Sequence, residues 1–292
     1  MYYKNPVYRI SYFFIVAILL IASILCVLPI IHIFMVSLSG RSAANANLVT
    51  LWPIDFTLTN YEKTLGNPAF YRSFMISVAR TVVGTAFSML ITVLTAYPLS
   101  MAKSVFRSRN FYLWFFVFIM IFNGGLVPYY ILIQKIGLLD SFWMYIIPGA
   151  LNVWNVILMM NFFRNLPKEL EEAALVDGAH FFDILFRIYI PTSMPGIATL
   201  SLFNIVGQWN DWFTGMLYMN SPDKWPLSTL LQTIVVAIDF NKLGMTPTDL
   251  ENLSQRGVKS AQIFITMLPI LVVYPFLQKY FVKGIVLGAV KE

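Results

Sequence analysis

The sequence predicts an all-α, polytopic membrane protein with six transmembrane helices. The chain is 58% hydrophobic and only 12% charged, and its mean hydropathy is +0.71, which lies outside the range of soluble globular proteins. Crossing a hydrocarbon core of about 30 Å takes about 20 apolar residues. Runs of that length recur along the chain, at residues 12–38, 73–100, 111–133, 142–163, 189–217 and 261–281.

The first apolar run follows Lys4 and Arg9, as the core of a signal peptide would. It is too long for such a core and shows no small-residue cleavage pattern before Pro29, so we expect it to be retained as a helix. We therefore divide the chain into an N-terminal segment, 1–70, with the first helix and an outer loop, and a core domain, 71–292, with five helices.

The basic residues predict the orientation. With both termini in the cytoplasm, the inside segments carry eleven of the 20 lysines and arginines, the outside segments carry eight, and Arg80 lies within the second run. The inside loops are also shorter, so their basic density is higher, as the positive-inside rule requires. The net charge of +6 therefore reflects topology, and we expect no nucleic-acid partner, which would need a contiguous basic face.

The apolar stretch at 225–238 resembles a seventh crossing, but we reject it as a span. Its length of about 21 Å is short of the hydrocarbon core, and counting it would move the C-terminal lysines outside. We expect an external helix lying at the membrane interface.

The chain offers no site for catalysis, metal or ATP. Its two histidines, His32 and His180, are far apart, and Cys26 is its only cysteine, so neither a metal cluster nor an internal disulfide is expected. An enzyme would need a cluster of nucleophile and base, and the sequence shows none. The phosphate loop G-x-x-x-x-G-K-[ST] is missing, since "GVKS" at 257–260 lacks the flanking glycines.

A polar-faced loop, 165–191, interrupts the apolar runs with "EEAALVDGAHFFDILFRIYIP" at 171–191. Pro167 suits the first turn of a helix and Gly178 its end, and a second helix over 180–189 would precede Pro191. Two short helices would lie on the cytoplasmic membrane surface, the first with a small, acidic face. A solvated amphipathic connector is the alternative.

The motif "EAALVDG", followed by nine residues and "IYIP", resembles the cytoplasmic EAA loop of the membrane subunits of binding-protein-dependent ABC importers. Ile190 stands where leucine is usual. The stretches "NGGLVPYYILI", "GQWNDWF" and "YPFLQKYFVKGIVLGAVKE" are similar to carbohydrate-uptake permeases, above all to the branch that imports oligosaccharides from polysaccharide breakdown. The similarity extends over nearly the whole chain.

This resemblance implies the type I ABC importer permease (MetI-like) fold and a non-catalytic subunit in the bacterial cytoplasmic (inner) membrane. The implied partners are a second, homologous permease subunit, two ATP-binding subunits that carry ATP–Mg, an extracytoplasmic solute-binding protein, a carbohydrate substrate and membrane lipid. The sequence does not separate an acidic oligosaccharide from a neutral one. An ion-driven secondary transporter is the alternative, although it would usually show inverted repeats and several midplane carboxylates.

The resemblance also implies a coupling helix that docks on the ATP-binding subunit. The residues it assigns to that contact are Glu171, Glu172, Ala173, Ala174, Asp177, Gly178, Ile188 and Pro191.

Polar residues at membrane depth usually face a cavity or another helix, and they mark a candidate substrate path. Indole faces beside amide and carboxylate groups would suit a sugar ring, whereas an interfacial aromatic belt is the alternative for the tryptophans. The glycines of "NGGLVP" at 123–128 would break the third helix, as a gate hinge, a cavity wall or a close-packing point. The candidates are Asn204, Gln208, Trp209, Asn210, Asp211, Trp212, Asn123, Gly124 and Gly125.

Two further features complete the expectations. Arg80 would either pair with a carboxylate across a subunit interface or snorkel. The outer loop, 218–259, would reach the solute-binding protein, or would simply be solvated. Its candidate contacts are Asn241, Thr246, Asp249, Glu251 and Asn252.

Overall fold

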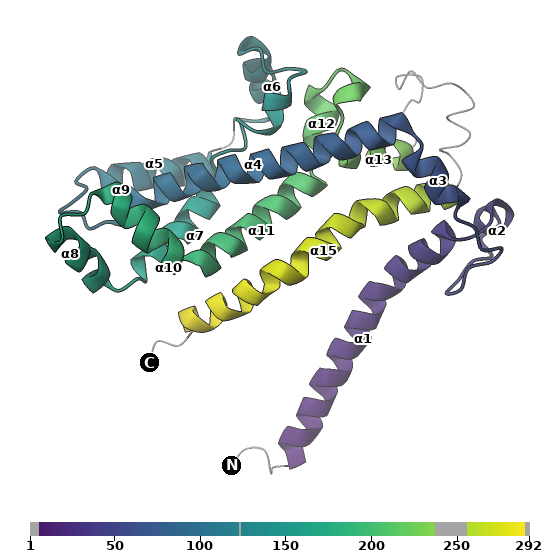
Figure 1. The fold of residues 1–292 in the computed structure, drawn as a ribbon, viewed down its shortest axis with the longest axis horizontal. Coiled ribbons are helices and arrows are strands. Elements are labelled where there is room, and N and C mark those ends of the chain that lie inside the picture. The colour runs from purple at the N-terminus through teal and green to yellow at the C-terminus, as the bar shows by residue number, and fades with distance from the viewer. Residues whose placement is uncertain (1–5, 123, 237–255, 290–292) are drawn as a thin grey trace. The chain divides into compact units, whose positions relative to one another are not determined.

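The computed structural model describes residues 6–122, 124–236 and 256–289, and every regular element in these ranges is helical (Figure 1). The chain divides into two compact units. One comprises Met1–Tyr71 with Thr233–Leu268, and the other comprises Arg72–Gln232 with Pro269–Glu292. The all-helical prediction is therefore confirmed for the described residues.

The first unit contains α1 (Pro6–Ser37), α2 (Arg41–Asn45), α3 (Thr59–Leu65) and the beginning of α15 (Arg256–Ala289). The buried amide of Asn60 donates hydrogen bonds to the carbonyls of Ser37 and Ser39, at 2.9 and 3.0 Å, and so ties α3 to the end of α1. Phe34 of α1 stacks on Phe264 of α15 with ring centroids 4.4 Å apart.

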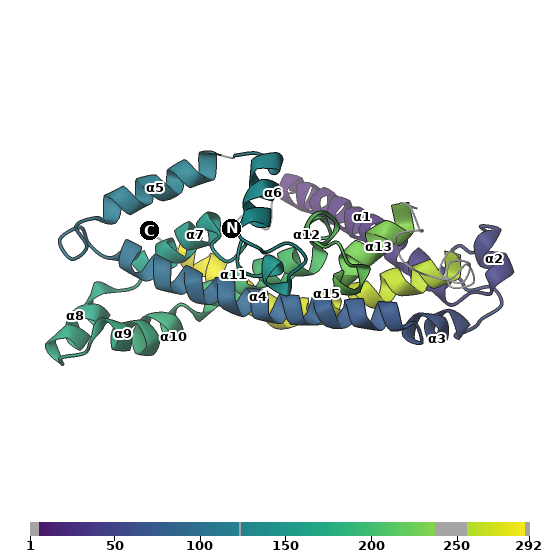
Figure 2. The same ribbon diagram turned by 90° about the horizontal axis from the view of Figure 1, so that it is seen from above.

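The second unit contains two clusters of buried hydrophobic side chains, and α4, α5, α7, α8, α9, η3 and α11 contribute to the larger one. Helix α11 runs alongside α4 in both views (Figures 1 and 2), and Ser88 of α4 donates a hydrogen bond to Asn204 of α11. The elements of the second unit are α4 (Pro68–Ser100), α5 (Arg109–Ile121), α6 (Leu126–Lys135), η2 (Phe142–Tyr145), α7 (Val153–Arg164), α8 (Lys168–Val176), α9 (Phe181–Ile184), η3 (Leu185–Tyr189), α10 (Ile190–Thr192), α11 (Met194–Asn210), α12 (Phe213–Tyr218), η4 (Pro222–Lys224) and α13 (Leu227–Val236).

Three described helical stretches are long and apolar enough to cross a membrane: Arg9–Ser37, Pro68–Ser100 and Arg256–Phe276. They correspond to the first, second and sixth apolar runs of the sequence. A fourth candidate is the pair α5 and α6, which are bent by 113° relative to each other. The structure thus supports several membrane spans, and the full count of six stays a prediction.

The helix break predicted at "NGGLVP" is confirmed. Helix α5 ends at Ile121 and α6 begins at Leu126, and Gly125 adopts φ +86°, a backbone conformation that side chains with a Cβ rarely take. The third apolar run therefore forms two helices and not one continuous helix.

The fourth and fifth apolar runs are also less regular than expected. Over 142–163 only α7 is α-helical, and its 12 residues cover about 18 Å. Pro148 and Gly149 precede this helix. It begins after Asn152, whose side-chain oxygen accepts the Asn155 N–H at 3.2 Å and caps the first turn. The run 189–217 is broken at Asp211, whose carboxylate accepts the Thr214 N–H at 3.1 Å and starts α12. Hydropathy predicted the location of both runs but not these caps.

Helix α13 has 10 residues, about 15 Å, and lies within the stretch that the sequence analysis rejected as a span. Leu227 and Leu230 are buried, and the Leu227 N–H donates to the Ser77 hydroxyl at 2.7 Å. This helix therefore packs on α4 of its own unit through its first turn.

Candidate functional site

The polar-faced loop forms a short helix with a defined end. Pro167 was expected in the first turn of this helix but is the N-cap of α8, which begins one residue later, at Lys168. Glu169 and Glu171 lie in the first turn, where the helix dipole favours negative charge. Gly178 adopts φ +79°, as predicted for the residue that ends this helix. The Gly178 N–H reaches the Leu175 carbonyl at 3.1 Å and completes a capped C-terminus.

Helix α8 has one buried and one exposed face. Ala174 is buried in the core of the second unit, which anchors the helix. Glu172, Ala173 and Asp177 are exposed, and so is Gly178. Leu175 and Val176 are exposed as well, so the exposed surface of α8 combines acidic, small and apolar side chains, as a docking surface for a partner would.

Glu171 does not share that free surface. The Tyr189 hydroxyl donates a hydrogen bond of 2.6 Å to its carboxylate. The Tyr189 ring in turn packs edge-on against Tyr97 of α4 and Phe163 of α7, with centroids 5.0 and 5.3 Å away. Glu171 is thus connected to two helices of the core through one tyrosine.

The second helix of the loop extends further than predicted. It was expected over 180–189 and to stop before Pro191, but it continues through α9, the π-helical turn η3 and α10 to Thr192. The wider π turn accommodates Pro191, which lacks an N–H and whose ring would clash with the preceding turn of an α-helix. Ile188 is half-buried against the core, whereas Pro191 is exposed.

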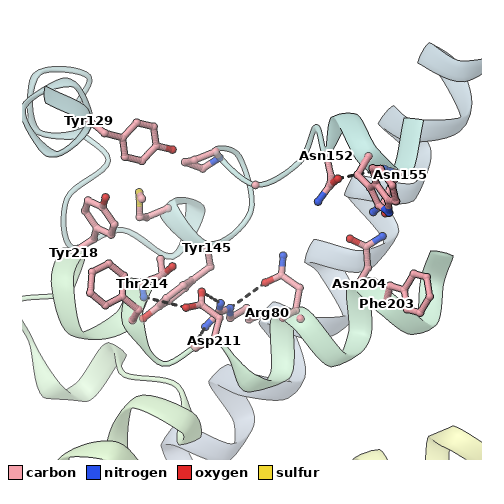
Figure 3. Close-up of a pocket in the computed structure, with 17 residues that line it drawn as sticks. Arg80, Tyr129, Tyr145, Asn152, Asn155, Phe203, Asn204, Asp211, Thr214 and Tyr218 are labelled. Atoms are coloured by element: carbon pink, nitrogen blue, oxygen red, sulfur yellow. Dashed lines mark hydrogen bonds and ion pairs between the residues drawn. The ribbon is translucent and has the colours of Figure 1, made fainter. Parts of the chain in front are cut away.

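A cavity of about 590 Å³ lies in the second unit (Figure 3). Its wall combines amide, hydroxyl and aromatic side chains from α4, α6, α7, α11 and α12, together with the irregular segment before α7. The lining residues are Arg80, Tyr129, Met144, Tyr145, Pro148, Gly149, Asn152, Trp154, Asn155, Phe203, Asn204, Gly207, Gln208, Asp211, Phe213, Thr214 and Tyr218.

The two charged residues of this wall neutralise each other. The buried guanidinium of Arg80 forms an ion pair with the Asp211 carboxylate and donates to the Asp211 carbonyl at 2.8 Å. Its Nε donates to Gln208 at 3.0 Å, and the group lies 4.7 Å from the centre of the Tyr145 ring. Arg80 therefore pairs within its own chain, so neither snorkelling nor a partner carboxylate is needed to explain it.

Three of the predicted path residues line the cavity: Asn204, Gln208 and Asp211. Their spacing of four and three residues places them on one face of α11. Gln208 also lies against Gly84, where an added Cβ would meet its amide nitrogen at 2.9 Å. Close approach of α4 and α11 therefore holds this amide in place.

The other predicted residues of α11 and its end do not line the cavity. Trp209 is buried and packs edge-on against Phe74, at 6.0 Å. Asn210 is exposed, and Trp212 packs edge-on against Phe213. The two tryptophans are thus not the aromatic wall that the sequence suggested.

Sequence reasoning missed the aromatic residues that do form the wall. They lie on five different elements, and the only local signal was the row of cavity-facing positions on α11, which includes Phe203 next to Asn204. The missed aromatic residues are Tyr129, Tyr145, Trp154, Phe203, Phe213 and Tyr218.

Gly124 and Gly125 line a neighbouring hollow of about 610 Å³, and Tyr129 borders both spaces. Asn123 lies outside the described residues, as do the candidate contacts of the outer loop. Those contacts are Asn241, Thr246, Asp249, Glu251 and Asn252.

A second polar cluster joins two loops near the cavity. Asp140, at φ +57°, accepts the N–H groups of Asn220 and Ser221, each at 3.1 Å. Its other carboxylate oxygen lies 2.6 Å from the Lys224 ammonium. Burial alone would raise the pKa of Asp140, but hydrogen bonds from Lys224 and Ser221 outweigh it and hold that pKa below its ordinary value. The Tyr145 hydroxyl donates to the Lys224 carbonyl at 2.9 Å and links this cluster to the cavity wall.

Comparison with known proteins identifies the family. Residues 73–287 match the family described as binding-protein-dependent transport system inner membrane component. The chain belongs to this family. It is therefore a multi-pass, non-catalytic permease of the inner membrane, and the ion-driven carrier is rejected.

Curated relatives and a solved structure agree with this assignment. The permease is 39% identical to the polygalacturonan/rhamnogalacturonan transport system permease protein YtcP of Bacillus subtilis, over 94% of this chain and 95% of that protein. It is 40% identical to protein LplC of the same organism, over 91% and 89% of the two chains. A crystal structure of a bacterial ABC transporter involved in import of the acidic polysaccharide alginate matches with a TM-score of 0.87 and 31% identity, covering 95% of this chain and 99% of that one.

Proposed function

We propose that this permease forms part of an ATP-driven importer for an oligosaccharide derived from an acidic polysaccharide. The cavity of the second unit carries the proposal, because its amides and aromatic rings offer what a sugar needs: hydrogen-bond partners for hydroxyls and flat apolar surfaces for the ring faces. The names of the relatives support the choice of substrate class, since YtcP is named for polygalacturonan and the solved transporter for alginate.

The charges of the cavity wall determine which parts of the substrate this subunit can bind. Arg80 and Asp211 are its charged lining residues and pair with each other, so this wall has no net charge to offer a uronate carboxylate. We therefore assign it to the hydroxyl groups and ring faces of the substrate. The second permease subunit of the proposed complex would supply the cationic groups.

Helix α8 would connect this cavity to the motor. In the proposed complex two ATP-binding subunits, which carry ATP–Mg, contact its exposed acidic face. Buried Ala174 and the Glu171–Tyr189 hydrogen bond support transmission of that movement to the core that also carries the cavity. Rigid-body shifts of packed helices would then switch access from one side of the membrane to the other.

The topology of the proposed complex follows the charge bias of the sequence. Six spans leave both termini and α8 in the cytoplasm, and the outer loop 218–259 faces an extracytoplasmic solute-binding protein. Such a protein delivers the oligosaccharide to the cavity.

The test uses the complete transporter in proteoliposomes with its binding protein. Oligogalacturonides should stimulate ATP hydrolysis and enter the vesicles, whereas malto-oligosaccharides should do neither. Gln208→Ala removes a cavity amide and should reduce uptake by about tenfold, which corresponds to one lost hydrogen bond of about 1.4 kcal/mol. Asn210→Ala is the matched control, since Asn210 is exposed and outside the cavity wall. Equal uptake of both glycans, or equal effects of both variants, would contradict the proposal.

A further inference from the structure

A second, apolar hollow lies between α5 and α7, away from the substrate cavity. It has a volume of about 400 Å³ and follows the first half of α5. Trp114, at its rim, is 73% exposed. The lining residues are Leu99, Asn110, Leu113, Trp114, Phe116, Val117, Val156, Ile157 and Met160.

Two arginines lie beside one end of this groove, next to its lining residues Leu99 and Asn110, although neither lines the groove itself. Arg164, at the end of α7, donates to the Leu99 carbonyl at 3.0 Å. Arg109, at the start of α5, donates to the Met101 carbonyl at 2.8 Å. These carbonyls are two residues apart at the end of α4, and Leu99 itself lines the groove, so both positive charges lie near its end.

The arginine pair lacks a counter-charge within the part of the chain that the structure describes. No described carboxylate forms an ion pair with Arg109 or Arg164. The Nε of Arg109 is buried and has no hydrogen-bond partner among the described residues. A guanidinium carries five N–H donors, and each of these two gives one to a described acceptor, so the pair can bind an anion with several oxygens.

We propose that an anionic phospholipid binds here, with its phosphate at Arg109 and Arg164 and an acyl chain in the groove between α5 and α7. Basic pockets between membrane helices on the cytoplasmic side are suited to anionic headgroups, and the orientation proposed above puts this end of the groove in the inner leaflet. From Asn110 to Val117 the groove runs about 10 Å along α5, the length of several methylene groups.

The combination of features selects a lipid over the simpler occupants. A free phosphate ion would use the arginines but leave the apolar groove empty. An apolar helix of a partner subunit would fill the groove but leave two positive charges without a counter-ion. An anionic phospholipid satisfies both parts. A zwitterionic phospholipid carries the same phosphate, but its ammonium group leaves no net negative charge to balance the two arginines.

The proposal is tested on the complete, purified transporter by native mass spectrometry during titration with phosphatidylglycerol or phosphatidylcholine. We expect phosphatidylglycerol to be retained with at least about a tenfold preference, because the ammonium group of phosphatidylcholine is repelled by the two guanidinium groups. Excess inorganic phosphate should not displace it. Equal retention of the two lipids, or displacement by phosphate, would overturn the proposal. This readout requires no transport, so it stands apart from the outcome of the glycan experiment.

Variants separate the groove from general attraction between basic residues and lipid. Val117→Trp fills the groove but keeps both arginines, and the double change Arg109→Gln with Arg164→Gln removes the charges. Each should abolish the preference. The control is Lys103→Gln with Arg107→Gln, which removes two exposed charges of the neighbouring loop and should keep it. An effect of the control as large as that of the arginine pair, no effect of Val117→Trp, or cross-linking of residue 117 to a partner helix would refute the site.

Discussion

The phenolic oxygen of Tyr189 lies 2.6 Å from a carboxylate oxygen of Glu171, to which it donates a hydrogen bond. This contact joins α8, the proposed docking helix, to the turn that leads into α11. The same ring packs against Tyr97 and Phe163, so a displacement of α8 has a direct route to α4 and α7. Removing this hydrogen bond should therefore uncouple the movement of the core helices from ATP hydrolysis.

Tyr189→Phe should uncouple the transporter while the fold persists. The ring and its aromatic contacts remain, and only the hydrogen bond to a charged group is lost, which costs about 1.5–3 kcal/mol. We expect the amount of sugar imported per ATP hydrolysed to fall by about tenfold. Uptake and phosphate release are measured in the same proteoliposomes.

Tyr97→Phe is the matched control for this change. The Tyr97 hydroxyl is buried and has no hydrogen-bond partner among the described residues, so its removal should leave coupling and stability nearly unchanged. Normal coupling in Tyr189→Phe, or the same loss in Tyr97→Phe, would show that force does not pass through the hydrogen bond to Glu171.

The Arg80–Asp211 pair should be required for stability. Asp211→Asn keeps an acceptor for the Thr214 N–H but leaves a buried, unpaired guanidinium, which costs about 3–5 kcal/mol. The double variant Arg80→Met with Asp211→Asn should recover much of that loss. Thermal unfolding in detergent measures both.

An exposed ion pair supplies the comparison. Arg72 pairs with Asp223 at the surface, and Arg72→Gln should cost no more than about 1 kcal/mol. If Asp211→Asn is as mild as Arg72→Gln, or the double variant is no better than the single one, the Arg80 charge is compensated by something other than Asp211.

Local rules explain which features the sequence predicted. The break before Leu126 and the end of α8 at Gly178 both depend on glycines in left-handed conformations, and neighbouring residues are enough to predict them. The interruptions of the fourth and fifth apolar runs depend on side-chain caps from Asn152 and Asp211, which a hydropathy average over a window does not detect.

The cavity required tertiary information. Asn204, Gln208 and Asp211 share a helix face, and helical periodicity alone would have separated them from Trp209. The partner of Asp211, in contrast, is 131 residues away in the sequence, and no local pattern connects it to Arg80. The Glu171–Tyr189 contact also depends on how the loop folds back, so Glu171 was grouped with the free acidic residues.

The Asp140–Lys224 cluster should make the loops beside the cavity sensitive to acid. Because the pKa of Asp140 is held below its ordinary value of about 4, its ion pair stabilises the fold above that value and is lost as the pH falls through the lowered one. Between about pH 5 and pH 3, the wild-type protein should lose more thermal stability than Asp140→Asn. Asparagine tolerates the left-handed backbone at this position, so the variant removes the charge without adding strain. Parallel pH profiles of the two proteins would show that this carboxylate does not contribute.

Charge reversal on the exposed face of α8 should block transport without blocking membrane insertion. Glu172 is exposed and free of intramolecular ion pairs with described residues, so Glu172→Lys would place a positive charge against the basic groove proposed on the ATP-binding subunit. We expect uptake to fall by at least about a hundredfold, because a like-charge contact at an interface costs several kcal/mol. Glu62→Lys makes the same change at an exposed glutamate of α3, outside the docking helix, and should retain most of the uptake. The measurements are uptake, membrane content of the permease and co-purification of the ATP-binding subunits. If Glu172→Lys retains these subunits and transports normally, the docking face lies elsewhere on the chain.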